Sequence, residues 1–163
     1  MKFITENISQ TKKIAKDLAG KFILMAAKER VPRGAVVIAL LGELGSGKTT
    51  FVQGFAHGFN IKKKIISPTF VLMRKFNLNN LPFKYFYHID CYRINNPREL
   101  LDLGLEEIFK DPQNIILIEW ADKIRQILPR GTNQIFLKHI GKKKREIIFK
   151  LSKTDLKKIK IKN

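Results

Sequence analysis

The segment Gly42-Glu43-Leu44-Gly45-Ser46-Gly47-Lys48-Thr49-Thr50 constrains this chain more than any other part of it. Its spacing, G-x-x-x-x-G-K-[ST], is that of a phosphate-binding loop, in which successive backbone N–H groups turn inward around an anion. Glycine permits the positive φ angles and the close approach that such a turn needs. We expect residues 45–50 to surround phosphate, Lys48 to reach the β- and γ-phosphates and the Thr49 hydroxyl to ligate Mg²⁺.

Both flanks of this loop have the character that a phosphate-binding loop requires. Before it, residues 35–41 form an uninterrupted apolar run, which predicts a strand covered on both faces. After it, apolar residues recur at helical spacing: Phe51, Val52, Phe55, Ala56 and Phe59. The loop is therefore expected to open a helix whose N-terminal dipole faces bound phosphates.

The length of 163 residues predicts a single domain over residues 1–163, with a basic tail from about residue 152. No apolar run is long enough to cross a bilayer, and the first residues turn polar too soon for a signal peptide, so no membrane association is expected. The single cysteine, Cys91, excludes an internal disulfide framework and a multi-cysteine zinc site. The expected location is cytoplasmic.

The chain is strongly basic, with 32 Lys and Arg residues against 14 Asp and Glu residues and a formal net charge of +18. Such an excess is typical of proteins that bind nucleic acid, but compositional drift in a chain rich in lysine, isoleucine and asparagine produces it too. The lysines are spread over several runs, and no run interleaves them with aromatic residues as a base-stacking platform would. Direct RNA contact is kept as an alternative.

The remaining periodicities predict a mixture of helices and strands. Helices are predicted over residues 11–28, 97–103, 105–109 and 121–128. Strands are predicted over residues 70–76, 82–89, 115–120, 134–140 and 146–151. Residues 70–76 and 82–89 are expected to form a β-hairpin, whereas the buried run 35–41 is typical of a parallel strand. The pattern therefore predicts an α/β, three-layer P-loop NTPase fold with a mixed parallel and antiparallel sheet.

Two of these apolar strands end in a carboxylate, Asp90 and Glu119. In phosphate-loop proteins, carboxylates at such positions hold Mg²⁺ or orient the attacking water. The residues alone do not say which carboxylate takes which role, and either could instead cap the next element. Trp120 is either a core residue or, beside Glu119, a wall of the nucleotide site.

Two loops carry further candidates. In Ser67-Pro68-Thr69-Phe70 the proline holds Ser67 extended, so the hydroxyl of Ser67 or Thr69 either faces the γ-phosphate or Mg²⁺ or belongs to an ordinary turn. The basic turn 141–145 is either a solvated loop or a site where Arg145 contacts phosphate or adenine.

Two tempting patterns are rejected. His88, Asp90 and Cys91 do not suggest a cysteine hydrolase, because residues three apart on a strand point to opposite faces. Ser152-Lys153-Thr154-Asp155 is similar to the guanine-reading motif of GTPases, but only eight residues follow it, too few for the rest of a guanine pocket.

Taken in order, the motifs resemble those of the TsaE/YjeE family of bacterial ATPases. The resemblance rests on the phosphate loop with its G-[DE]-L-G spelling and on four later segments. These are Ser67-Pro68-Thr69-Phe70, His88-Ile89-Asp90-Cys91-Tyr92-Arg93, Pro97-Arg98-Glu99-Leu100 followed by Gly104, and Leu117-Ile118-Glu119-Trp120. The match covers about residues 9–120.

The resemblance implies a Mg²⁺-dependent ATPase that is slow alone and acts in tRNA threonylcarbamoyladenosine biosynthesis with TsaB- and TsaD-like partners, reaching tRNA through that complex. It implies that Glu119, with Thr49, holds Mg²⁺ and that Ser67 and Thr69 sense the γ-phosphate. Asp90 is expected to orient or activate water, although the two carboxylates could exchange roles. Thr11 falls where the family has a threonine near the nucleotide. Cys91 and Arg98 stand at variable positions of the family.

Two other classes of function compete with this interpretation. A small-molecule kinase needs a lid of arginines and an acceptor pocket, and the few arginines after Arg93 are scattered. A non-enzymatic RNA-binding module would lose affinity steeply with salt and would not depend on Lys48.

Overall fold

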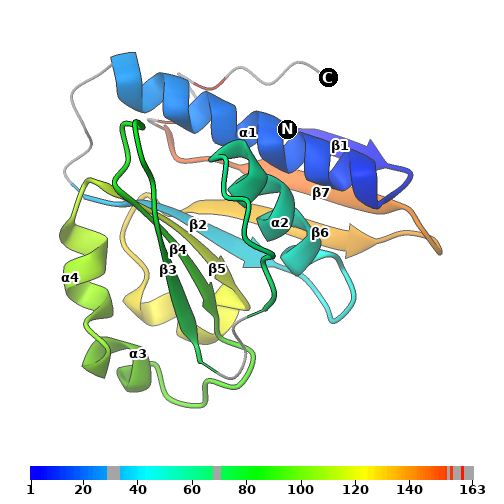
Figure 1. The fold of residues 1–163 in the computed structure, drawn as a ribbon. Helices are drawn as coiled ribbons and strands as arrows, with labels where there is room; N and C mark the ends of the chain where they lie inside the picture. Colours follow the sequence, from blue (N-terminus) through cyan, green and yellow to red (C-terminus); the bar gives the residue numbers. More distant parts are fainter. Residues whose placement is uncertain (29–33, 68–70, 154, 156–158, 160–163) are drawn as a thin grey trace.

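The computed structural model describes residues 1–28, 34–67, 71–153, 155 and 159. A seven-stranded sheet lies between two layers of helices (Figure 1). Its strands are β1 (Lys2–Thr5), β2 (Val36–Leu41), β3 (Met73–Asn77), β4 (Tyr85–Asp90), β5 (Asn114–Glu119), β6 (Asn133–His139) and β7 (Arg145–Lys150). The helices are α1 (Ile8–Lys28), α2 (Lys48–Gly58), α3 (Arg98–Asp102), α4 (Leu105–Lys110) and the 3₁₀-helix η1 (Ala121–Ile127).

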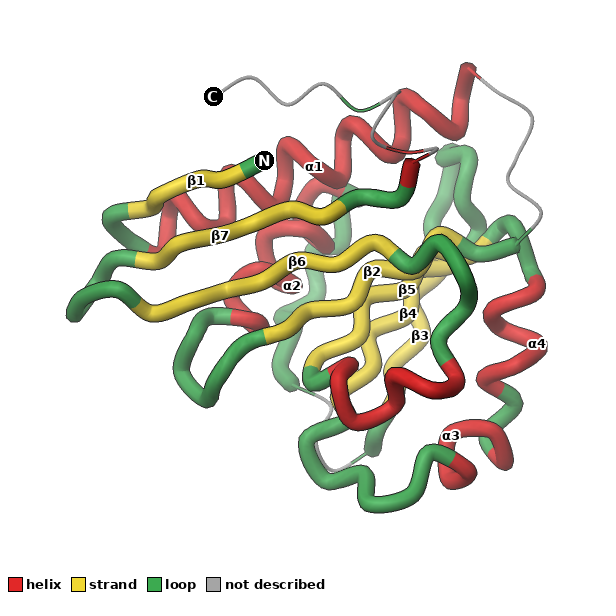
Figure 2. The backbone as a smooth tube through the Cα atoms, turned by 180° about the vertical axis from the view of Figure 1, so that it is seen from behind, coloured by secondary structure: helices red, strands yellow, loops and turns green. Residues whose placement is uncertain are grey.

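The strand order is β1-β7-β6-β2-β5-β4-β3, which Figure 2 shows from behind. The four central strands β6, β2, β5 and β4 are parallel, whereas β3 pairs antiparallel with β4 at one edge. At the other edge β6, β7 and β1 pair antiparallel. The predicted α/β fold with three layers and a mixed sheet is therefore confirmed.

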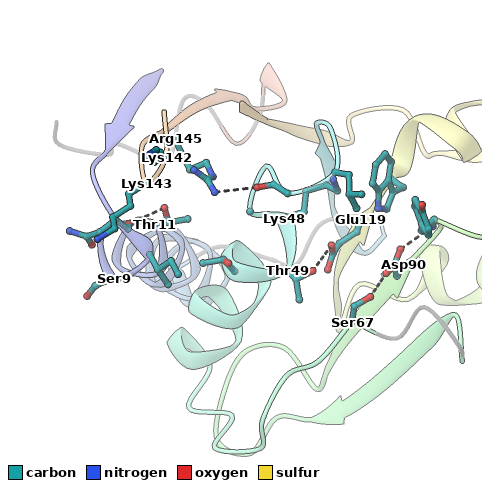
Figure 3. A pocket seen from close by; sticks show the side chains of 18 residues that line it. Ser9, Thr11, Lys48, Thr49, Ser67, Asp90, Glu119, Lys142, Lys143 and Arg145 are labelled. Atoms are coloured by element: carbon teal, nitrogen blue, oxygen red, sulfur yellow. Dashed lines mark hydrogen bonds between the residues drawn. The ribbon is translucent and has the colours of Figure 1, made fainter. Parts of the chain in front are cut away.

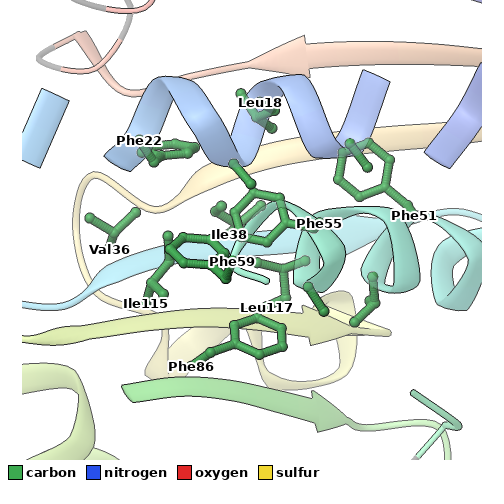
Figure 4. Close-up of a cluster of buried hydrophobic side chains, with 14 of the residues drawn as sticks. Leu18, Phe22, Val36, Ile38, Phe51, Phe55, Phe59, Phe86, Ile115 and Leu117 are labelled. Atoms are coloured by element: carbon green, nitrogen blue, oxygen red, sulfur yellow. The ribbon is translucent and has the colours of Figure 1, made fainter. Parts of the chain in front are cut away.

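Alternation along the central strands supplies both faces of the sheet with apolar side chains. On one face, Ile38 of β2 and Leu117 of β5 pack under α1 and α2 (Figure 4). The helices contribute large side chains that are fully buried, including Phe22 of α1 and Phe51 and Phe55 of α2. Each such side chain contributes about 1.5–3 kcal/mol through burial. The apolar spacing predicted after Lys48 is thus the inner face of α2.

The opposite face of the sheet is covered by the three short helices. Val37 and Ala39 of β2 point to this side, between the residues that face α1 and α2. They share a second core cluster with Leu100 of α3, Leu105 of α4 and Ile124 of η1. β2 is buried on both faces, as its continuous apolar run predicted.

Several boundaries differ from the prediction for identifiable reasons. Helix α1 begins at Ile8 rather than at residue 11, because the side chain of Asn7 accepts the backbone N–H of Gln10 at 3.0 Å and starts the helix earlier. Strand β1 was not predicted; it has four residues and depends on pairing with β7 rather than on a pattern of its own. The segment after Glu119 is a kinked 3₁₀-helix, with Ile124 outside helical φ/ψ.

In the part of the chain that the structure describes, no helix combines the length and the apolar character needed to cross a bilayer.

Helices α1 and α2 approach each other through glycine. A Cβ atom built on Gly54 of α2 would lie 2.5 Å from the Cα atom of Lys12 in α1, and one built on Gly58 would lie 2.6 Å from the Cβ of Ala19. Glycine at both positions therefore lets the two helix backbones touch. This contact fixes α1 beside the helix that the phosphate loop opens.

We predict that Gly54→Ala destabilises the protein by about 1–3 kcal/mol, because its methyl group overlaps the α1 backbone. This loss outweighs the roughly 0.5–1 kcal/mol that alanine gains over glycine inside a helix. The matched control is Gly20→Ala in α1, where a built Cβ meets nothing within 4 Å and only the gain is expected. Urea unfolding followed by circular dichroism measures both. Equal effects of the two substitutions would contradict the close approach.

Candidate functional site

The loop between β2 and α2 has the backbone of a phosphate cradle. Gly42, Gly45 and Gly47 have φ angles of 146°, 75° and 99°, which are rarely open to residues with a side chain. A Cβ on Gly42 would collide with the carbonyl oxygen of Leu137, whereas one on Gly45 would meet nothing within 4 Å. The loop thus packs tightly on β6 at its base and stays open at its rim.

Lys48 follows this loop as the first residue of α2, and its side chain is held from three sides. Its Nζ atom donates to the carbonyl oxygens of Gly42 at 2.8 Å and Glu43 at 2.9 Å. The same atom lies 3.7 Å from the centroid of the Trp120 ring. Burial lowers the pKa of Lys48, and the nearby carboxylates of Glu119, Asp90 and Asp122 act in the opposite direction.

The register of the parallel strands brings the two predicted carboxylates to this loop. Leu40 of β2 pairs with Glu119 of β5, and Glu119 pairs with Asp90 of β4. Directly paired residues on neighbouring strands point to the same face. Asp90 and Glu119 therefore lie side by side at the carboxyl ends of their strands, where ligands bind in open α/β sheets.

Glu119 uses both of its oxygens within the protein. The Thr49 hydroxyl donates to Oε2 at 2.9 Å. Nε2 of His88 lies 2.8 Å from Oε1, and we assign the shared hydrogen to the imidazole because a carboxylate oxygen is the acceptor. His88 is fully buried, and Nδ1 has no partner among the described residues. These contacts fix the carboxylate of Glu119 next to the first turn of α2.

Asp90 is oriented by neighbours of its own. The Ser67 hydroxyl donates to Oδ2, and the backbone N–H of Tyr92 donates to Oδ1 at 2.9 Å. The structure thus brings the predicted Ser67 to the predicted Asp90. Thr69, the other hydroxyl predicted in that loop, lies outside the described residues.

The far side of the phosphate loop meets the start of β7, just after the turn from β6. Nη2 of Arg145 donates to the carbonyl oxygen of Gly45 at 3.2 Å. Arg145 pairs with Thr5 in the sheet, and the Thr5 hydroxyl lies 2.9 Å from that of Thr11 in α1. The predicted Arg145 and Thr11 are therefore neighbours of the loop, through the β1–β7 edge of the sheet.

These groups surround one pocket of about 840 Å³ (Figure 3). Its lining includes Thr11, Gly45, Gly47, Lys48, Thr49, Thr50, Ser67, Asp90, Glu119, Trp120 and Arg145, all of them residues that the sequence indicated. Ser46 is the predicted loop residue that does not line it. Its side chain is buried, and Oγ has no partner among the described residues.

Comparison with known proteins agrees with this geometry. The family model described as "Threonylcarbamoyl adenosine biosynthesis protein TsaE" matches residues 5–147. The chain belongs to the TsaE family. It is 41% identical over 149 residues to the protein of Bacillus subtilis named "tRNA threonylcarbamoyladenosine biosynthesis protein TsaE", covering 91% of this chain and 84% of that protein.

Two further relatives extend this comparison. The protein of the same name from Rickettsia felis is 34% identical over 143 residues, which cover 87% of this chain and 75% of that protein. The crystal structure of YdiB from Bacillus subtilis superposes with a TM-score of 0.71 at 34% identity, covering 94% of this chain and 86% of that one. The predicted family is thus confirmed, and with it the fold.

The structure of this TsaE-family chain adds site residues that the sequence did not single out. Tyr92 lines the pocket, and its ring centroid lies 5.1 Å from that of Trp120, so the two rings form one wall. His88 was part of the family motif and of the rejected hydrolase pattern, but no role in the site was predicted for it. Its position two residues before Asp90 on one strand puts both on the same face, and that alternation could have revealed it. Asn7, Ile8 and Ser9 reach the pocket through the unpredicted start of α1.

The donor set suits a hard cation shared with a phosphate ligand. Among the described residues, no group of three or more His, Cys, Asp or Glu side chains could hold a metal alone. Mg²⁺ does not need such a cage, because it is bound by one or two carboxylates together with substrate phosphates and water. The hydroxyl of Thr49 and the carboxylate of Glu119, which lie 2.9 Å apart, are oxygen donors that could hold such an ion.

The two patterns rejected at the outset have structural explanations. Asp155 accepts a hydrogen bond from Asn133 at 2.8 Å, and its backbone N–H donates to Ser152 at 3.1 Å, so it anchors the chain after β7 at the start of β6. Cys91 is buried in the core on the side of α3 and α4, and burial raises the pKa of its thiol to about 12. A thiolate nucleophile requires a shift in the opposite direction.

We predict that Cys91 is unreactive toward a thiol reagent such as Ellman's reagent at pH 8 in the folded protein. Because Cys91 is the only cysteine, the reaction reports on this site alone. In 6 M guanidinium the thiol returns to an ordinary pKa near 8.5 and should react completely within the mixing time of minutes. Rapid, stoichiometric labelling of the folded protein would contradict the burial of Cys91.

Proposed function

We propose that this chain is a Mg²⁺-dependent ATPase that acts with TsaB- and TsaD-like proteins in the transfer of a threonylcarbamoyl group to the adenosine next to the tRNA anticodon. The family and the names of its relatives support the pathway. One observation supports the chemistry most directly: Lys48 and Thr49 of the phosphate loop face the paired carboxylates Asp90 and Glu119 across one pocket.

The pocket fits a nucleotide in size and in chemistry. Its volume of about 840 Å³ lies in the range of small-molecule and cofactor sites. The open rim at Gly45 leaves the loop backbone accessible to phosphate. The partly buried ammonium group of Lys48 gains more from an anionic partner than an exposed one would, because the low local dielectric strengthens the attraction.

Each residue then has a distinct task in the proposed reaction. Lys48 offsets charge on the β- and γ-phosphates, and Thr49 and Glu119 hold Mg²⁺, directly or through water. When bound, Mg²⁺ supplies further neutralisation of the phosphate charge. Asp90, held by Ser67 and the backbone of Tyr92, orients the attacking water. Positioning and charge compensation of this kind account for most of the catalysis in phosphoryl transfer.

The walls of the pocket bear on the nucleotide as well. Arg145 can exchange the carbonyl oxygen of Gly45 for a phosphate oxygen with a small movement of its side chain. Trp120 and Tyr92 form an aromatic wall beside Lys48. Among the described lining residues Arg145 is the one arginine, which favours an ATPase over a small-molecule kinase with an arginine-rich lid.

ATP hydrolysis by the chain with its TsaB- and TsaD-like partners tests this proposal. We expect hydrolysis to be slow alone and faster in the complex. Lys48→Ala should abolish nucleotide binding in fluorescence titrations. Asp90→Asn should bind Mg²⁺–ATP nearly as well as the wild type but lower kcat about 10²- to 10⁴-fold, as loss of a general base does. Glu119→Gln should weaken Mg²⁺–ATP binding with less effect on ATP in the presence of EDTA.

The effects of the two substitutions on Mg²⁺ dependence and on kcat distinguish the roles of Asp90 and Glu119. If Glu119→Gln spares the Mg²⁺ dependence and Asp90→Asn removes it, the two carboxylates exchange roles. If neither substitution alters hydrolysis while the proteins remain folded by circular dichroism, the ATPase proposal fails. A pull-down of the TsaB- and TsaD-like proteins with and without ATP tests the partner assignment separately.

We further predict that His88 positions Glu119 through its Nε2–H group. His88→Leu should weaken the Mg²⁺-dependent part of nucleotide affinity about 10- to 100-fold, because partners of metal-binding carboxylates have effects of this size. The measurement is a Mg²⁺ titration of a fluorescent ATP analogue bound to the protein, without turnover.

The matched control is His88→Gln, whose side-chain amide can donate from nearly the same place as Nε2. It should restore most of the Mg²⁺ affinity, whereas a merely space-filling role of His88 would be served as well by leucine. Equal Mg²⁺ affinities for the leucine and glutamine variants would therefore exclude the positioning role.

A further inference from the structure

The excess of positive charge is distributed unevenly over the two helical layers. Helix α1 carries five lysines and one aspartate, for a net charge of +4. On the other side of the sheet, residues 98–111, which include α3 and α4, have a net charge of −3, and η1, with two basic residues and one acidic residue, has a net charge of +1, so these segments together carry −2. Compositional drift alone would enrich both layers in lysine, so the layers differ in a way that requires another explanation.

The basic side continues from α1 onto the turn between β6 and β7. Lys142 and Lys143 of this turn line the pocket together with Ile8 and Ser9, so the turn lies against the first residues of α1 (Figure 3). Lys12, Lys13 and Lys16 follow on the next turns of the helix, and Lys13 and Lys16 are exposed. We call these five residues, Lys12, Lys13, Lys16, Lys142 and Lys143, the α1 basic surface.

The protein does not neutralise these charges within its described part. None of the five lysines forms an ion pair with a described residue, whereas the neighbouring Lys144 pairs with Glu6 at 2.9 Å. Like charges at this spacing on a helix repel one another. A ligand with several negative charges would remove that repulsion.

The composition of the surface favours a nucleic acid over an acidic protein. Protein interfaces are enriched in aromatic residues and depleted in lysine, and this surface has lysines and no aromatic residue. Nucleic-acid interfaces use lysine to contact phosphates. Without aromatic side chains for stacking on unpaired bases, contacts to the backbone of folded RNA fit better. An anionic membrane fits less well, because the apolar side of α1 is buried in the core.

We propose that the α1 basic surface docks the phosphate backbone of folded RNA, tRNA in particular, without reading its sequence. The surface reaches the rim of the pocket, because Lys142 and Lys143 line it, but Lys12, Lys13 and Lys16 are not among the lining residues. Substitutions of these three lysines therefore test RNA binding apart from the proposed ATPase reaction. The chain would then contact tRNA itself in addition to any contact made through partners.

The test is binding of a fluorescein-labelled, unmodified tRNA transcript, followed by anisotropy between 50 and 200 mM KCl. With about four or five phosphate contacts, log Kd should rise with log [KCl] with a slope of about 4. The triple variant Lys12→Glu, Lys13→Glu, Lys16→Glu should bind at least tenfold more weakly at 50 mM KCl, with the slope reduced by about 3.

A matched variant separates a local surface from net charge. Arg98→Glu, Lys110→Glu, Arg125→Glu places three reversals on exposed residues of the opposite layer. Each reversal removes two charge units, so both triple variants have a net charge of +12 in place of +18. The proposal requires that the opposite-layer variant bind tRNA like the wild type within about threefold. Equal losses in the two variants would overturn it.

Three further results decide the remaining alternatives. Lys48→Ala should bind tRNA like the wild type, so a failed ATPase proposal would leave this one standing. Tighter binding to poly-glutamate, or to phosphatidylserine vesicles, than to tRNA would overturn RNA as the ligand. If the glutamate triple variant does not fold by circular dichroism, Lys12→Gln, Lys13→Gln, Lys16→Gln serves instead, with the same expected reduction of the salt slope.

Discussion

The parallel pairing of β2, β5 and β4 is the constraint on which the site depends. Neither Asp90 nor Glu119 is near the phosphate loop in sequence; the pairing of the strands sets their register against Leu40 and against each other. A slip of one residue in either pair would turn a carboxylate to the opposite face of the sheet. Such a slip would also expose the apolar residues that are buried on both faces of these strands. The hydrophobic core therefore fixes the positions of the two carboxylates.

A second level of order lies in the contacts made by the carboxylates. Glu119 is held by Thr49 from the loop side and by the buried His88 from its neighbour strand. Asp90 is held by Ser67 and by the backbone after β4. The two acids sit in adjacent positions but have different partners, which gives a physical basis for separate roles. In the function proposed above, Glu119, which accepts the Thr49 hydroxyl, would hold the metal, and Asp90 would orient the water.

Much of this could be predicted because the informative patterns are local. The phosphate loop, the apolar run of β2 and the helical spacing in α2 each lie within one window of sequence, and the structure agrees with them. Strand β1 and the start of α1 were missed because they depend on pairing with β7 and on one capping side chain. The role of His88 required knowing that β4 lies beside β5. A strand order is a long-range property that no single window contains.

The net charge of the chain can be read from the sequence, but the position of the charges on the molecule requires the fold. A net charge of +18 could not separate drift from a binding surface, because a sum carries no position. The fold assigns the charges to places: lysines on α1 and on the β6–β7 turn, and acids on α3 and α4. Repulsion within one layer destabilises the folded chain in low salt, and nothing in the core requires those side chains to be lysine. This electrostatic repulsion is present on one side of the sheet and not on the other. A polyanionic ligand explains that difference better than compositional drift does.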